Sequence, residues 1–418
     1  MAKRNICDRI QSFNLSQNRD RILLAQKYEA MRSNAFVFLR GTCHLFYQDL
    51  PVKSWFKKAP LVWICGDLHI ENFGSYKSDR RNLYFDINDF DEAILAPCTW
   101  EVSRFLTSIF VAASSVNIRE QDAELLCQQF LAAYTKALAT GKAYWVGKDT
   151  AEGMIASLLE RKNQEKRIDL LEKRTEIIKG ERKIKNDPKR SLPVSTKQCQ
   201  KIEKWMKEFA SQQADPPFFK LLDVAQRIAG TGSLGIERYI LLVEGKGSPD
   251  RNYLLDLKAS VSSSLQPYAA WEQPTWETEA ERVVGVQTRM QAVPIAFLHA
   301  VAIDGKSYVL RELQSTQSPT DRLKLEKWDD KLKEVGELME SLGQTVAWAQ
   351  LRSSGRQYSA IADQLIDFAG IDKWRDALLT YAKEYSHQVQ ADWQEFKKGS
   401  DRLLQELHAS ETLDSKRK

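Results

Sequence analysis

The heptapeptide GDLHIEN, residues 66–72, holds the clearest candidates for chemistry in this chain. It follows the short apolar run LVWIC at residues 61–65, which predicts a buried strand that ends in a loop. In such a loop the carboxylate of Asp67 can accept a proton from a hydroxyl group, and the amide of Asn72 can reach a metal ion held nearby. This spacing suits phosphoryl transfer. A tight turn in which both side chains cap backbone groups is the structural alternative.

A second polar stretch, FDINDFDE at residues 85–92, crowds four carboxylates and one amide between apolar side chains. Strand alternation buries Phe85 and Ile87 and turns Asp86 and Asn88 to the other side. Like charges packed this closely beside apolar residues are costly unless a cation neutralises them. The stretch therefore predicts a divalent metal site, and an acidic surface turn is the alternative.

A complete GxGxxG pattern, GTGSLG, occupies residues 230–235. The dinucleotide-binding form of this pattern needs a helix after it, but the strand-like run 236–244 follows here. We therefore expect a glycine-rich loop between strands, with its backbone N–H groups over phosphates; a β-turn without a ligand is the alternative. The residues expected to contact the nucleotide are Gly230, Thr231, Gly232, Ser233 and Gly235.

Lys258 ends the next strand-like run, at residues 252–258. A lysine there can reach the phosphates of a nucleotide if a glutamate from an adjacent helix orients it. Glu277, Glu279 and Glu281 precede or open the next helical stretch, and helical position favours Glu281 as the partner. A lysine whose stem lies along the strand end, with its charge in solvent, is the alternative.

The elements that must position these residues follow from hydrophobic periodicity and turn signals. The dipeptide Asp304-Gly305 predicts a tight hairpin, so the region 217–313 reads as antiparallel strands plus one helix. Strands are expected at 61–65, 82–87, 236–244 and 252–258, with a hairpin at 295–313, and helices at 20–50, 99–140, 278–292 and 321–418.

The charge is unevenly distributed along the 418 residues. The net charge of +5 is weak evidence for a nucleic-acid partner, and residues 160–190 hold 12 basic and 7 acidic side chains, which accounts for the whole excess. Leu170, Ile177 and Ile184 recur every seven residues there, which predicts one charged helix with an apolar stripe, interrupted by Gly180. A solvated helical insert is expected, and a docking face for phosphate or an acidic partner is the alternative.

Composition and cysteine spacing exclude several classes of protein. The six cysteines show no CxxC pair, so zinc ribbons and thioredoxin-like motifs are not indicated, and reduced thiols are expected. The N-terminal stretch lacks the apolar segment of a signal peptide. The longest apolar run, near residues 109–116, is far shorter than a membrane span. A cytoplasmic protein that does not bind a membrane is expected.

The two acidic motifs resemble those of the aminoglycoside phosphotransferase and choline kinase branch of the protein-kinase-like superfamily. By this resemblance Asp67 is the catalytic-loop aspartate, Asn72 is the metal-binding asparagine, and Asp89, before Phe90, is the metal aspartate. The glycine loop and Lys258 take the phosphate-binding roles. A cysteine, Cys65, stands where those enzymes have the histidine of their HGD motif.

The chain also resembles, more closely, the uncharacterised bacterial family known as domain of unknown function 2252. The resemblance extends over most of the chain, from about residue 30 to 350. The matching stretches are FLRG (38–41), CGDLHIENFG (65–74), FDINDFDEA (85–93), Trp100-Glu101 with Arg104, RIAGTGSLG (227–235) and ERVVGVQ (281–287).

The order of the motifs departs from that of kinases, in which the glycine loop and lysine precede the catalytic aspartate. A circular permutation reconciles the two orders, so we expect an α+β, two-lobed, kinase-like fold with a small β-rich lobe and a large helical lobe. Glu312 and Leu313 would lie near the hinge. The expected parts are 1–150 (large lobe with catalytic and metal loops), 151–215 (charged helical insert), 216–320 (small lobe) and 321–418 (helical remainder of the large lobe).

These features together predict a phosphotransferase that uses ATP and Mg²⁺, or Mn²⁺, on an unidentified small-molecule or protein acceptor. Three other classes stay open. They are a nucleotide-binding regulator without turnover, an enzyme that transfers AMP, and a metal-dependent hydrolase built on the carboxylates alone.

Overall fold

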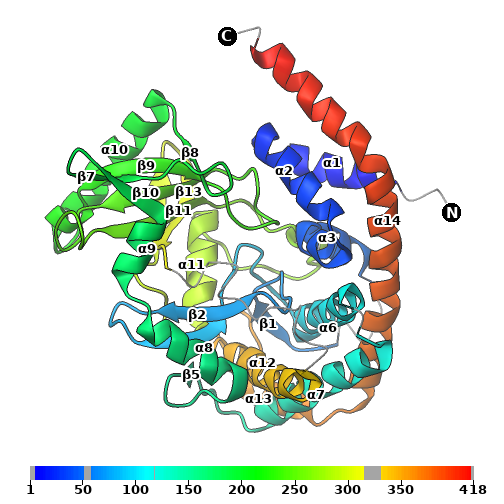
Figure 1. Cartoon of the computed structure of the whole chain (residues 1–418). Coiled ribbons are helices and arrows are strands. Elements are labelled where there is room, and N and C mark those ends of the chain that lie inside the picture. Colours follow the sequence, from blue (N-terminus) through cyan, green and yellow to red (C-terminus); the bar gives the residue numbers. More distant parts are fainter. Residues whose placement is uncertain (1–4, 51–57, 117, 315–330, 416–418) are drawn as a thin grey trace.

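The computed structural model describes residues 5–50, 58–116, 118–314 and 331–415. An antiparallel sheet and its helices form one side of the molecule, and a group of mostly longer helices forms the other (Figure 1). This arrangement confirms the predicted α+β class. In the described part of the chain, no helix is both long enough and apolar enough to cross a lipid bilayer. The expected boundary at 320/321 lies outside the described residues.

The largest sheet has six antiparallel strands in the order β12, β13, β11, β10, β9, β8. Helix α10 (Thr196–Ser211) covers one face, where Trp205 and Phe209 pack with Leu241 and Leu255 of the sheet. On the opposite face, Leu171 packs with Ile240 and Leu254 and covers part of the sheet. The strands are β8 (Ser191–Pro193), β9 (Leu221–Arg227), β10 (Arg238–Val243), β11 (Tyr253–Ala259), β12 (His299–Ile303) and β13 (Lys306–Glu312).

The hairpin of β12 and β13 turns at the predicted dipeptide. Asp304 and Gly305 have φ angles of 49° and 75°, both in the left-handed region that a two-residue hairpin turn requires. Helix α11 (Glu279–Met290) lies in the sequence between β11 and β12, as predicted. Its buried Val286 and Met290 belong to the main core, so this helix links the sheet to the rest of the molecule.

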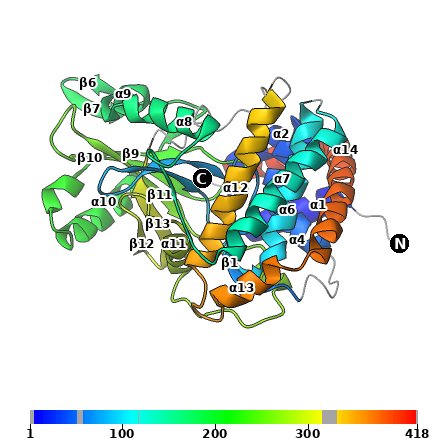
Figure 2. The same cartoon turned by 90° about the horizontal axis from the view of Figure 1, so that it is seen from below.

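Long helices pack closely in the other half of the molecule. Gly343 of α12 lies so near α7 that an added Cβ atom would be 2.4 Å from the carbonyl oxygen of Phe130 (Figure 2). The helices are α1 (Ile6–Ser16), α2 (Arg21–Arg32), α3 (Ala35–Gly41), α4 (Cys43–Asp49), α6 (Cys98–Ser115), α7 (Glu120–Ala139), α12 (Leu332–Arg352), α13 (Ala362–Ala369) and α14 (Lys373–Ser415).

Helix α14 runs beside α1, α2 and α3, so segments from opposite ends of the sequence share one core (Figure 1). Phe396 of α14 is fully buried, with its ring centroid 6.0 Å from that of Tyr28 and 5.5 Å from that of Phe38. The backbone N–H of Ile6 donates to a Glu395 carboxylate oxygen at 3.2 Å. These contacts hold the N-terminal helices to the helical half.

Two small sheets carry the acidic motifs. Strand β1 (Leu61–Ile64) pairs with β4 (Ile94–Pro97), and β2 (Phe73–Lys77) pairs with β3 (Leu83–Ile87), which also pairs with β5 (Val146–Gly147). The predicted strands at 61–65 and 82–87 are therefore confirmed. Strand β1 ends two residues before the first motif, and β3 ends within the second.

The expectation of a single charged helix through residues 160–190 is wrong. Helices α8 (Gly153–Gln164) and α9 (Arg167–Arg174) are followed by a hairpin of β6 (Thr175–Ile178) and β7 (Glu181–Ile184). Lys179 and Gly180 have φ angles of 52° and 84°. These angles reverse the direction of the chain, so the residues spaced seven apart do not lie on one helix. Within residues 151–215, β8 joins the main sheet and α10 packs on it.

Candidate functional site

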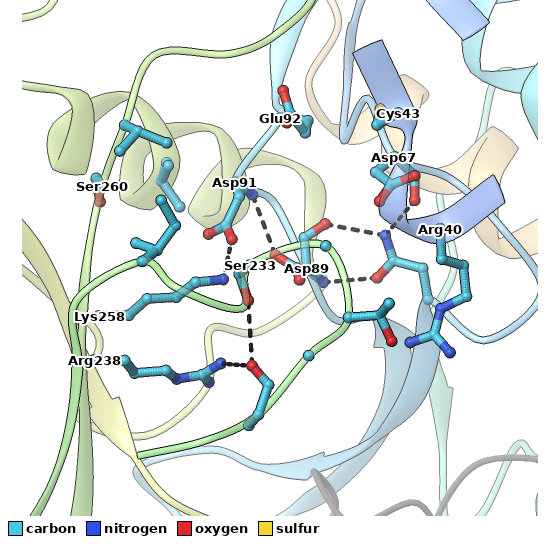
Figure 3. Close-up of a pocket in the computed structure, with 18 of the residues that line it drawn as sticks. Arg40, Cys43, Asp67, Asp89, Asp91, Glu92, Ser233, Arg238, Lys258 and Ser260 are labelled. Atoms are coloured by element: carbon cyan, nitrogen blue, oxygen red, sulfur yellow. Dashed lines mark hydrogen bonds and ion pairs between the residues drawn. The ribbon is translucent and has the colours of Figure 1, made fainter. Parts of the chain in front are cut away.

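One cavity brings the acidic loops and the glycine loop together. The loops that follow β1 and β3 line one side of it, and the glycine loop and the open face of the main sheet line the other (Figure 3). Among the described residues, the charged or amide side chains that line it include Arg19, Lys27, Asp67, Asn72, Asp89, Asp91, Arg227, Arg238, Lys258, Gln287 and Arg311.

Asp67 follows β1 and is held by a buried arginine. Its Oδ1 atom accepts two hydrogen bonds from Arg104 of α6, the one from Nε at 2.8 Å. Arg104 is fully buried, and although burial opposes its charge, Asp67 raises the pKa of Arg104 above its ordinary value. The other oxygen, Oδ2, lies 3.9 Å from the position of a Cβ atom added to Gly232. One oxygen of Asp67 is thus anchored while the other faces the glycine loop.

Gly66 is required for the loop that carries Asp67. Its φ angle is +83°, and a Cβ atom there would lie 2.2 Å from the carbonyl oxygen of Glu92. The loops after β1 and β3 therefore touch at this point, which only glycine permits.

Asn72 ties the two acidic loops together. Its Nδ2 donates to the carbonyl oxygens of Asp67 at 3.0 Å and Asp89 at 3.2 Å, and its Oδ1 accepts from the backbone N–H of Asp89 at 2.8 Å. The sulfur of Cys65 lies 3.8 Å from the same Nδ2 atom. An amide oxygen has two lone pairs, so Oδ1 keeps one that a metal ion could use.

Asp89 is ionised at neutral pH. Burial opposes ionisation, but the positive charges of Lys258 and Arg311 lower the pKa of Asp89 to about 2. Lys258 itself forms an ion pair with Asp91, two residues further on (Figure 3). The structure therefore brings Asp67, Asp89 and Lys258 to one cavity, as the sequence predicts.

The donor set around Asp89 fits magnesium only if a ligand completes it. In the described ranges, no three histidine, cysteine, aspartate or glutamate side chains form a group able to hold a metal. Mg²⁺ is usually bound through one or two carboxylates, with water and substrate phosphates supplying the other oxygens. Asp89 and the remaining lone pair of Asn72 match that requirement when a phosphate-bearing molecule is bound.

The glycine loop joins β9 to β10 and is fixed from outside the sheet. The carbonyl oxygen of Gly232 accepts from Arg19 at 2.8 Å and from the buried ammonium of Lys27 at 3.1 Å. Burial and the neighbouring Arg19 charge lower the pKa of Lys27 well below its ordinary value. Gly235 has a φ angle of +88°, and its carbonyl accepts from the N–H of Asp20 at 2.8 Å. No motif in the sequence pointed to Arg19 or Lys27.

The predicted pair of Lys258 and Glu281 does not form. Glu281 lies in the first turn of α11, where its carboxylate accepts from the backbone N–H of Glu277 at 3.2 Å. Glu279 pairs instead with Arg282 of the same helix. Helix α11 presents Gln287, rather than an acidic side chain, to the cavity, and Lys258 takes Asp91 as its partner.

A cluster of arginines on the open face of the sheet was not predicted. Asp256 of β11 is almost fully buried and forms ion pairs with Arg227, Arg238 and Arg311. The signal in the sequence is an aspartate in the otherwise apolar strand YLLDLKA, two residues before Lys258 and so on the same face. We refer to these four residues as the arginine cluster.

Comparison with known proteins gives a family and no function. The model of a family described as an uncharacterized protein conserved in bacteria, domain of unknown function 2252, matches residues 19–399. No curated protein and no solved structure matches the chain.

Proposed function

Since the chain belongs to the uncharacterised bacterial family domain of unknown function 2252, its activity must be argued from its own site, and we propose an ATP- and Mg²⁺-dependent phosphotransferase with a circularly permuted, kinase-like fold. The acceptor is a molecule with a hydroxyl group. Asp67 is the catalytic residue, Asn72 and Asp89 hold the metal, and the glycine loop and Lys258 bind the phosphates.

The order of elements in the main sheet supports the kinase-like fold. In protein kinases a glycine-rich loop covers the phosphates, a lysine lies on the third strand, and a helix follows it. Here the glycine loop joins β9 to β10, Lys258 lies on β11, which is the third strand counted from β9, and α11 comes next. A permutation accounts for the acidic loops preceding these elements, and the packing of α1 against α14 agrees with it.

The observation that carries the proposal is the meeting of two distant segments at one cavity. The loop of Asp67 and the loop of Gly232 are far apart in the sequence, yet a Cβ atom on Gly232 would lie 3.9 Å from Oδ2 of Asp67. A hydrolase built on the carboxylates alone has no need of a glycine loop at this place. Phosphoryl transfer needs both, because one binds the phosphate chain and the other positions the acceptor.

The chemistry follows from these positions. The acceptor hydroxyl gives its proton to Oδ2 of Asp67 while its oxygen forms a bond to the terminal phosphorus. The bond from that phosphorus to the bridging oxygen breaks, and the leaving ADP keeps the electron pair. Lys258 neutralises charge on the phosphate chain once its pair with Asp91 opens, and the metal supplies further neutralisation.

The test is thermal unfolding with ATP and MgCl₂, combined with ADP release in the presence of candidate acceptors. We expect ATP and Mg²⁺ to raise the midpoint of the wild type by several degrees and Asp89→Ala to lose that shift. Asp363→Ala, an exposed carboxylate at the start of α13, is the matched control. No shift in the wild type would overturn the proposal.

Turnover separates the remaining classes. Nucleotide binding without ADP release for any acceptor would favour a regulator, and release of pyrophosphate with labelled AMP on the acceptor would show AMP transfer. Lys258→Ala should abolish phosphoryl transfer, whereas a metal-dependent hydrolase would keep its activity.

A further inference from the structure

The face of the main sheet that looks into the cavity is charged along its centre. Alternate residues of a strand share a face, so Asp256 and Lys258 of β11 point the same way. In the register of the sheet, Lys258 lies opposite Arg238 of β10 and Asp256 lies opposite Arg311 of β13. A nucleobase is bound by stacking in an apolar or aromatic slot, and this part of the cavity wall offers guanidinium groups instead.

The arginine cluster is tightly connected. Arg238 forms two bonds to Asp256, from Nε to Oδ1 at 2.8 Å and from Nη2 to Oδ2 at 2.6 Å. Arg227 lies 2.7 Å and Arg311 3.5 Å from the same carboxylate. One carboxylate thus serves three guanidinium groups, and all three arginines line the cavity.

Positive charge is in excess at this place. The arginine side chains are only 4%, 8% and 14% exposed, so water compensates little of it. Burial and the neighbouring Arg238 charge lower the pKa of Arg227 to about 9, and Asp256 offsets only part of this effect. Over all described side chains that line the cavity, seven lysines and arginines face five aspartates and glutamates. Buried positive charge that its neighbours leave uncompensated is stabilised by a bound anion.

Apolar and aromatic side chains also line the cavity, among them Ile236, Val283, Ile295 and Phe13. Phe13 stacks on His44 with a centroid distance of 3.8 Å, and both line this cavity and the more open depression beside it. One face of the Phe13 ring is therefore already covered by His44, and this part of the wall is shared with the more open depression.

Resting on the proposed function, we infer that the phosphate donor is recognised by its phosphate chain rather than by its base. The arginine cluster holds the phosphates that are not transferred and stabilises their charge as they leave. Arginine suits this role because its planar donors match phosphate oxygens in pairs. Nucleoside triphosphates with different bases, and inorganic tripolyphosphate, then form one class of ligand.

The experiment is isothermal titration of the full chain with ATP, GTP and inorganic tripolyphosphate, each with MgCl₂, and with adenosine. We expect dissociation constants within about threefold of one another for the three triphosphates, and no binding of adenosine. Binding of ATP at least tenfold tighter than both GTP and tripolyphosphate would overturn the inference.

Two variants of the arginine cluster should act in opposite directions. Arg311→Gln removes the least buried arginine and should raise the dissociation constants of all three triphosphates tenfold or more. Asp256→Asn removes the internal competitor for the guanidinium groups and should tighten binding severalfold while lowering stability. Arg251→Gln, an exposed arginine in a turn, is the control. If Asp256→Asn does not fold, Arg311→Gln decides, and wild-type affinity in that variant contradicts the inference.

These outcomes separate the inference from the proposed function. Tripolyphosphate binding without any transfer to an acceptor would overturn the phosphotransferase and leave the donor recognition standing. Phosphoryl transfer with strict selection for adenine would overturn the inference on donor recognition and leave the phosphotransferase standing. The absence of binding by every triphosphate would overturn both.

Discussion

The two carboxylate oxygens of Asp67 have different roles. One oxygen is committed to Arg104, which fixes the orientation of the side chain, and the other faces the space where an acceptor would react. Arg104 is fully buried, so it depends on Asp67 for charge compensation. The proposed catalytic role and the stability of the fold are therefore coupled at this residue.

A substitution that keeps the shape of Asp67 should separate these roles. Asp67→Asn retains an oxygen that can accept from Arg104 but removes the base, so we expect phosphoryl transfer to fall by roughly 10²–10⁴-fold. Stability should fall by about 3 kcal/mol or more, since the buried Arg104 charge loses its counter-charge. Activity assays and urea unfolding measure the two effects. An active Asp67→Asn protein would exclude Asp67 as the base.

Glu101 is a second buried carboxyl group, and its titration should be visible in stability. It accepts from the N–H of Cys65 and from Gln350, and burial raises its pKa to about 7. Between about pH 4.5 and 7 the unfolded chain loses this proton and the folded chain keeps it.

The free energy of unfolding should therefore decrease as the pH rises through that window, by about 3 kcal/mol in total from this group, and stay level above pH 7. In Glu101→Gln this contribution should vanish, so the difference between wild type and variant should change with pH over the same window. Chemical unfolding at a series of pH values measures it. A constant difference would mean that Glu101 titrates normally.

At the scale of elements, the glycine loop is unusual in being held from outside the sheet. Arg19 and Lys27, from the α1–α2 connection and α2, bond to the carbonyl of Gly232, so the N-terminal helices take part in shaping the cavity. The conformation of the glycine loop therefore depends on helices that contain no recognised phosphate-binding motif.

Lys27→Met should release the loop while keeping the size of the buried side chain. We expect faster amide hydrogen exchange at residues 228–237 and weaker nucleotide binding, with little change in exchange elsewhere in β9 and β10. Lys136→Met, at an exposed position of α7, is the matched control. Unchanged exchange at 228–237 would show that Arg19 alone holds the loop.

The elements that could be predicted from the sequence are those with strong local signals. They include the hairpin at Asp304-Gly305, helix α11 and the strands that lead into the two acidic motifs. The hairpin of β6 and β7 was missed because Ile177 and Ile184 fit a helical repeat equally well.

The partners of the charged residues could not be predicted, because they depend on contacts between distant segments. Asp91 reaches Lys258 only because the loop after β3 packs under the sheet, and helical position alone favoured Glu281. The residues of the arginine cluster come from four strands. Lys27, which bonds to the glycine loop, comes from α2. The spacing of residues along the chain carries no information about contacts between such distant segments.

At the scale of the whole molecule, one apolar core runs from the N-terminal helices through the acidic loops to α14. Buried residues as far apart as Ile10, Leu68 and Leu403 belong to it. The loops that carry the candidate catalytic residues therefore rest on the same core as the last described helix.

Phe396→Ala tests how much the packing of α14 contributes to the stability of the common core. The ring is fully buried against Tyr28 and Phe38, so its loss should cost about 3–5 kcal/mol in free energy of unfolding. Because Phe396 does not line the cavity, nucleotide affinity at low temperature should be unchanged. Phe396→Leu should cost clearly less. Urea unfolding followed by tryptophan fluorescence measures both, and a loss below 1 kcal/mol would show that α14 is not part of the common core.

The contact between α1 and α14 also has a consequence for how the protein is made. Ile6 meets Glu395 in the folded state, and a ribosome adding roughly 5–20 residues per second needs on the order of 20–80 s to make the chain between them. During that time the side of α1 that packs on α14 has no partner, and the loops of Asp67 and Asp89 exist before the glycine loop does. We expect the nascent N-terminal helices to need a chaperone until translation reaches α14.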